Sequence, residues 1–206
     1  MEEKPNYEKD LASIRDIMER SSKFVSLSGL SGILAGLYAI LASVYAFYNI
    51  YFEQLVRPSQ YFESNPALVR RLIFVAFITL VASLVTGFYF SHKKATRVGS
   101  SIWNATSKRM LFNLSIPLVA GGLFTIICLW HGYYGIAAPI CLLFYGLALV
   151  NASHNLFDEI RYLGYCEIGL GILSAIFIGY GLFFWAFGFG VLHILYGVLM
   201  YRKYDS

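Results

Sequence analysis

Residues 24–52 read FVSLSGLSGILAGLYAILASVYAFYNIYF, a run of 29 residues between Lys23 and Glu53 in which no side chain is charged. A helix needs about 20 mostly apolar residues to cross the hydrocarbon core of a bilayer. The run is long enough for one such helix and too long for the apolar core of a cleavable signal peptide. It predicts that the chain is an integral membrane protein inserted by this first span.

Three further runs without Lys, Arg or Asp extend this pattern. They enclose 20 residues from Arg71 to His92, 48 from Arg109 to Asp158, and 40 from Arg161 to Arg202. Glycines at 130–135 and 179–181 supply a turn inside each of the two long runs. The runs therefore predict one, two and two more spans. The six predicted spans are residues 24–48, 70–91, 110–130, 134–152, 159–178 and 182–201.

The composition of the 206 residues agrees with this fold class. Hydrophobic residues make up 58% and charged residues 14%, and the mean hydropathy is +0.61. An ordinary soluble domain has about 25% charged residues. The balance excludes a disordered chain, a coiled coil, a nucleic-acid-binding domain and a disulfide-rich scaffold. We expect an all-α, polytopic six-helix transmembrane bundle, a single membrane domain over residues 24–206.

Basic residues predict the orientation of the bundle. Of sixteen Lys and Arg residues, only Arg57, Arg70 and Arg71 fall on one side of the predicted spans. Cytoplasmic loops carry the Lys and Arg excess, so both termini are expected in the cytoplasm and the protein in the cytoplasmic (inner) membrane. The net charge of +4 then indicates contact with anionic lipid rather than with nucleic acid.

Residues 1–23 are predicted to form an amphipathic helix. Its apolar stripe holds Leu11, Ile14, Ile17 and Met18. Such a helix lies along the cytoplasmic interface, or it packs on a partner subunit or on the bundle itself. The expected partners are the lipid bilayer and either a second copy of the chain or another membrane protein.

Glu167 is the only acidic residue well inside a predicted span, and it gives the strongest candidate site. If the last two spans form an antiparallel hairpin, Glu167 lies opposite His193. Small residues on the two helices (Gly164, Gly171 and Ser174; Ala186, Gly190 and Gly197) predict a tight seam around this pair. The pair is either a structural hydrogen bond that fixes the hairpin or a protonatable site for transport or sensing.

Three weaker features complete the candidates. His154, Asp158 and Arg161 cluster at the predicted cytoplasmic junction, but their spacing matches no zinc motif, so neither a metal site nor a cofactor is predicted. Ser28, Gly32 and Gly36 form a helix-packing stripe, within the bundle or across a homodimer. Pro117 and Pro139 are expected to kink their helices and free a backbone carbonyl.

Two stretches, Arg15–Ser22 (RDIMERSS) and Glu159–Gly164 (EIRYLG), resemble an uncharacterised family of small bacterial multi-pass membrane proteins. The resemblance implies a bacterial cytoplasmic membrane and supplies no activity, ligand or catalytic residue.

Three functional hypotheses follow from the sequence. The leading one is a non-enzymatic structural, accessory or sensor protein, whose contact surfaces are the N-terminal helix and the basic 92–109 segment. The second is a small proton-linked transporter or channel that uses Glu167 and His193. The third is an intramembrane enzyme, although no nucleophile–base pair is visible in the sequence. A hydrated cavity reaching Glu167 would favour transport, whereas solid packing there would favour an accessory role.

Overall fold

The computed structural model describes residues 28–52, 66–97, 99 and 103–205, and over these residues the chain is helical without any strand. The predicted all-α fold is confirmed. The expected amphipathic helix over residues 1–23 lies outside the described residues.

The described elements follow one another with short connections. Their bounds are α2 (Gly29–Phe47), the π-helix η1 (Tyr48–Phe52), α4 (Pro66–Arg97), α5 (Ala105–Trp130), the 3₁₀ turn η3 (Tyr134–Ile136), α6 (Ala137–Ala152), the 3₁₀ turn η4 (Ser153–Asn155), α7 (Asp158–Ile176), α8 (Gly181–Trp185), the π-helix η5 (Ala186–Leu192) and α9 (His193–Tyr204). The segments α8, η5 and α9 form one continuous rod, called here the last span. Gly132 and Gly179 adopt φ angles of 83° and 105° in the two turns that the glycines predicted.

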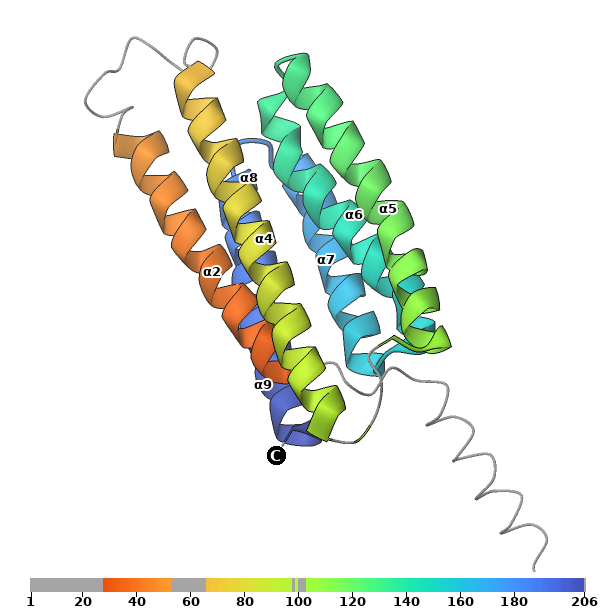
Figure 1. Cartoon of the computed structure of the whole chain (residues 1–206). Helices are drawn as coiled ribbons and strands as arrows, with labels where there is room; N and C mark the ends of the chain where they lie inside the picture. The colour runs from red at the N-terminus through yellow and green to blue at the C-terminus, as the bar shows by residue number, and fades with distance from the viewer. Residues whose placement is uncertain (1–27, 53–65, 98, 100–102, 206) are drawn as a thin grey trace, which may run out of the picture.

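Five described segments are long and apolar enough to cross a membrane: Gly29–Tyr51, Ala67–Arg97, Ala105–Trp130, Tyr134–Ala152 and Gly181–Tyr204. The fifth predicted span, residues 159–178, corresponds to α7, which is not among them. Its 19 residues include Asp158, Glu159, Arg161 and Glu167, and these charges lower its apolar character. It nevertheless runs beside α6 (Figure 1), and the neighbouring helices cover Glu167 completely.

The helices form two groups of three (Figure 1). One group holds α2, α4 and the last span, and the other holds α5, α6 and α7. Helix α4 packs chiefly on α2, and α5 packs chiefly on α6, so these two helices lie at the edges of the bundle. The last span makes most of the contacts between the groups, through α6 and α7. The packing between the two groups is therefore made mainly by side chains and backbone of the last span.

Glycines set the closest helix approaches, but not where the sequence predicted them. A Cβ atom on Gly146 of α6 would lie 2.6 Å from the carbonyl oxygen of Gly164 on α7. On the other side, a Cβ on Gly36 of α2 would lie 2.6 Å from the carbonyl oxygen of Gly190. The predicted tight seam between the last two spans is therefore wrong. Gly164 and Gly171 of α7 face α6, and Gly190 and Gly197 of the last span face α2. A stripe of small residues does not encode which helix it meets.

The stripe of Ser28, Gly32 and Gly36 faces the last span. A Cβ on Gly32 would lie 3.2 Å from the Cα atom of Gly197. Ser28 stands just before α2, and its hydroxyl donates to Asp205 Oδ2 at 2.9 Å. The structure thus places these residues in a contact within one chain.

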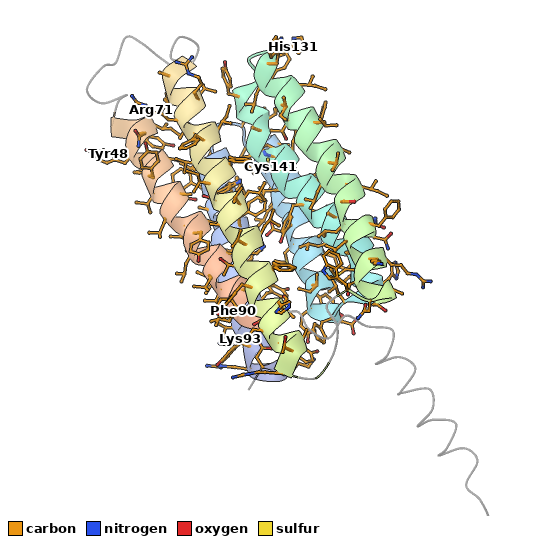
Figure 2. All side chains as sticks on the ribbon, in the orientation of Figure 1. Tyr48, Arg71, Phe90, Lys93, His131 and Cys141 are labelled. Carbon is orange, nitrogen blue, oxygen red and sulfur yellow. The ribbon has the colours of Figure 1, made fainter. Side chains whose placement is uncertain are left out.

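Ionic contacts tie together the end of the bundle at which α2 begins and α9 ends, called here the basic end. Figure 2 shows Lys93 at this end and His131 at the opposite one. Asp205 Oδ2 accepts hydrogen bonds from Ser28 Oγ and from the backbone N–H of Gly29, and Oδ1 pairs with Lys94 Nζ at 2.5 Å. A residue beyond the last helix therefore caps the first turn of α2 and links it to α4.

Candidate functional site

A π-helical segment in the last span builds the candidate site. Residues Ala186–Leu192 (AFGFGVL) widen the helix between α8 and α9. Within this segment the carbonyl oxygen of Gly188 lies 3.0 Å from Nδ1 of His193, five residues later. A carbonyl only accepts, so Nδ1 carries the hydrogen. Single π turns inside α-helices occur frequently at functional sites.

The other ring nitrogen of His193 meets α6. Tyr145 Oη lies 2.7 Å from Nε2. In a neutral imidazole with its hydrogen on Nδ1, Nε2 is the acceptor, so the Tyr145 hydroxyl donates to it. The Tyr145 and Phe189 rings flank the imidazole with centroids 5.3 and 5.8 Å away. A directed chain of hydrogen bonds thus runs from Tyr145 through His193 to the Gly188 carbonyl.

Glu167 stands beside this chain without joining it. Its Oε1 lies 3.6 Å from His193 Nδ1, which is beyond hydrogen-bond distance. The side chain has no exposed surface, and among the described residues neither carboxyl oxygen has a hydrogen-bond partner. Native proteins pair nearly all buried polar groups, so an orphaned carboxyl group inside a bundle requires an explanation.

The surroundings of Glu167 are closely packed. A Cβ atom on Gly188 would lie 2.5 Å from Oε2 and 2.7 Å from a methyl carbon of Leu142. Leu142 is fully buried, as is Ser174, two turns further along α7. A side chain at position 188 would therefore displace the carboxyl group of Glu167 or the Leu142 methyl group from the π-helical backbone.

The antiparallel register that the sequence predicted does bring Glu167 and His193 together. It did not predict Tyr145 or Gly188, which make the two hydrogen bonds of His193. Tyr145 is one of sixteen tyrosines and carries no distinguishing spacing. Gly188 stands in a glycine-rich run (Gly188 and Gly190), which is the only sequence signal for the π segment.

The second predicted cluster is divided in the structure. Arg161 donates from Nε to Ser153 Oγ at 3.2 Å, and its guanidinium lies 3.9 Å from Asp158 in a solvent-facing pair. His154 is exposed. Glu159 contacts the last span instead, with Lys203 Nζ at 2.5 Å. The contact between Glu159 and Lys203 links α7 to α9 at the basic end of the bundle.

Pro117 lies inside α5, where it has no N–H for the carbonyl of Asn113 four residues earlier. That carbonyl accepts a hydrogen bond from Asn151 Nδ2 of α6 at 2.7 Å. The neighbouring helix therefore supplies the donor that the proline lacks. Pro139 occupies the first turn of α6, directly after η3. The backbone N–H groups of a first turn have no acceptor within the helix, so the N–H that proline lacks removes no helical hydrogen bond there.

Within the described ranges, no group of three His, Cys, Asp or Glu side chains is placed to hold a metal ion. A shallow, open hollow lies at the basic end of α5 and is lined by Lys108, Arg109, Phe112 and Asn113. It is far along the chain from Glu167 and shares no residue with the candidate site. The Tyr145–His193–Glu167 group is therefore the chemically distinctive part of the described interior, and side chains of these types are able to bind and release a proton.

Comparison with known proteins places the chain in a family. A family model described as "TMEM128 protein" matches residues 28–156. No curated protein and no solved structure matches the chain. The family match runs from the start of α2 to η4, so it covers neither Arg15–Ser22 nor Glu159–Gly164, and it includes Tyr145 but not Glu167 or His193. It supports a membrane protein family and does not bear on bacterial origin. Because the match extends over more than half of the sequence, the chain belongs to the TMEM128 protein family.

Proposed function

We propose that this membrane protein is a non-enzymatic accessory or sensor component that acts by contact with other membrane constituents. The observation that carries the proposal is the close packing around Glu167, which has no exposed surface. A transporter binds its cargo near the bilayer midplane in a site that opens to water. The Gly188 backbone and Leu142 fill that position here.

The contact surface that we propose is the basic end. Lys93, Arg97, Lys108 and Arg109 are all exposed there, and Trp103 beside them is 59% exposed. Basic residues next to membrane helices attract anionic lipid headgroups, and they also fit an acidic segment of a partner. The proposed partners are the bilayer and either a second copy or another membrane protein. We place both termini, and with them this end, in the cytoplasm, on the support of the Lys and Arg distribution.

The test compares complexes in the native membrane. A Lys93→Gln, Arg97→Gln, Lys108→Gln, Arg109→Gln variant leaves Lys94 and its pair with Asp205 intact. We expect the native chain to migrate in a mild-detergent extract as part of a larger complex, and the variant to migrate alone with unchanged helix content. A native chain that migrates as a monomer, or a variant that keeps the complex, would count against the proposal.

The orphaned carboxyl group of Glu167 favours a second candidate, a proton-linked transporter. The chain reconstituted in sealed liposomes, with an entrapped pH-sensitive dye and an imposed proton gradient, separates the two. Proton flux that exceeds that of empty liposomes and disappears in Glu167→Gln would support transport. Equal flux in all three preparations would support the accessory role.

A further inference from the structure

The N–H group at Nδ1 of His193 has two oxygen acceptors near it and can donate a well-formed hydrogen bond to only one of them. The Gly188 carbonyl oxygen lies at 3.0 Å and accepts the hydrogen bond, while Glu167 Oε1 lies at 3.6 Å and does not. A displacement of well under 1 Å separates the two arrangements. The second would leave the Gly188 carbonyl, inside the π-helical segment, without this donor.

The protonation state of Glu167 determines which of the two oxygens is the stronger acceptor for His193 Nδ1–H. A carboxylate accepts more strongly than a peptide carbonyl, because hydrogen bonds to ionised groups are about twice as strong as neutral ones. A carboxylic acid has no such advantage. In the structure, His193 Nδ1–H donates to the Gly188 carbonyl and not to Glu167. The acid form of Glu167 favours this arrangement.

We propose that Glu167 is a proton-binding site, and that gain or loss of this proton moves the hydrogen bond of His193 Nδ1 between Gly188 and Glu167. The proton is exchanged with water, and no other covalent bond changes. The proposal does not rest on the accessory role proposed above, since a transporter could use the same site.

The groups that face Glu167 make this a simple site. Tyr145 faces it from α6, and His193 faces it from α9. The sequences of α8 (GLFFW) and η5 (AFGFGVL) contain no titratable side chain. On α7 itself, the adjacent Cys166 contacts Tyr196 instead. The carboxyl group has no exposed surface and lies where a Cβ on Gly188 would clash with it, so this packing leaves space for a proton and not for a hydrated metal ion.

The position of the site gives the proton a structural effect. Glu167 belongs to the group of α5, α6 and α7, whereas Gly188 and His193 belong to the last span, which packs on α2 in the other group. A hydrogen bond from His193 to Glu167 joins the two groups directly, and a bond to Gly188 stays within the last span. Loss of the proton therefore exchanges a local hydrogen bond for one between the groups.

Two signals from the full chain in lipid nanodiscs test the proposal. With ¹³C-carboxyl-labelled Glu, infrared difference spectra between pH values report a protonated carboxyl group. With ¹⁵N-labelled His, solid-state NMR reports the Nδ1–H of His193 once His92, His131 and His154, all exposed, are replaced by Gln. We expect a carboxylic acid band that is lost as the pH rises, and a His193 signal that changes with the same midpoint.

Variants identify the group responsible. Glu167→Gln is expected to remove the band and to make the His193 signal independent of pH, while the matched control Glu159→Gln, at the basic end, leaves both unchanged. If Glu167→Gln does not fold, Tyr145→Phe replaces it, because loss of the hydroxyl that donates to Nε2 must shift both midpoints together. Absence of the band at every pH at which the chain stays folded would overturn the proposal. So would a His193 midpoint unaffected by either variant, or a band that Na⁺ abolishes at constant pH, which would indicate a cation site.

Discussion

The hydrogen bond from Asn151 to the Asn113 carbonyl exists because of Pro117, and a double-mutant cycle tests this dependence. In Asn151→Leu the carbonyl of Asn113 loses its donor, and Pro117 provides no replacement. In Pro117→Ala the alanine N–H can bond to that carbonyl as in a regular α-helix. The effect of Asn151→Leu is therefore expected to depend on which residue stands at position 117.

The magnitude follows from the membrane environment. Hydrogen bonds between transmembrane helices contribute about 0.6 kcal/mol on average and up to about 1.7 kcal/mol. The bond is exposed and Asn113 lines the open hollow at the basic end, so water or lipid headgroups partly satisfy the freed carbonyl and the lower part of this range applies. The 2.7 Å distance indicates a well-formed bond. We expect Asn151→Leu to lower the free energy of unfolding by about 0.5–1 kcal/mol in the native background and by less than about 0.3 kcal/mol beside Pro117→Ala, a coupling of about 0.5 kcal/mol.

Unfolding in mixed micelles of a native-like detergent and sodium dodecyl sulfate, followed by circular dichroism, measures all four proteins of the cycle. Asn113→Ala is the matched control, because the bond uses the backbone carbonyl of residue 113 and not its side chain. Equal losses in the two backgrounds would refute the role assigned to the proline. A loss in Asn113→Ala as large as that in Asn151→Leu would refute the assignment of the bond to the backbone.

Further predictions concern the ends of the bundle and its closest contacts, with the same unfolding assay. Asp205→Ala removes the acceptor of the Gly29 N–H and is expected to cost about 1–2 kcal/mol, whereas Asp205→Asn keeps the cap and should cost less than half as much; equal costs would mean that the ion pair dominates. Gly146→Val places a Cβ 2.6 Å from a carbonyl oxygen of α7 and should cost about 1–3 kcal/mol, while Gly122→Val, with open space around it, should be nearly neutral. Gly179→Ala, at φ 105°, is expected to cost about 1 kcal/mol, and an unchanged stability would show that the turn relaxes.

Much of the fold follows from where charges are absent. The run between Lys23 and Glu53 contains α2, and the run between Arg109 and Asp158 contains most of α5 and all of α6, because a helix in lipid tolerates few charged side chains. The same argument is least direct for α7, in which Glu167 is an exception that only the surrounding helices can cover. Charge placement therefore predicts which segments are helical rods, and not how they pair.

The candidate site shows the same division. Opposition of Glu167 and His193 follows from a short turn and antiparallel geometry, which sequence numbers alone can express. The contribution of Tyr145 depends on α6 lying beside both helices, and that of Gly188 on a widened helical turn. Neither is a property of a local pattern, since tertiary packing selects the π geometry and the rotation of α6. The glycines were assigned to the wrong neighbours for the same reason.

The contact of α2 with the last span has a consequence for biosynthesis. Of the described helices, α2 is synthesised before the others, yet Gly36 packs against Gly190, and Asp205 caps the first turn of α2. Until about 150 further residues have been inserted, this helix has only α4 as a native neighbour among the described helices. Pairing between segments so distant in the chain is slow, and it leaves helix faces uncovered while it waits. Among the described helices, α2 is thus the earliest in the chain and among the last to complete its native contacts.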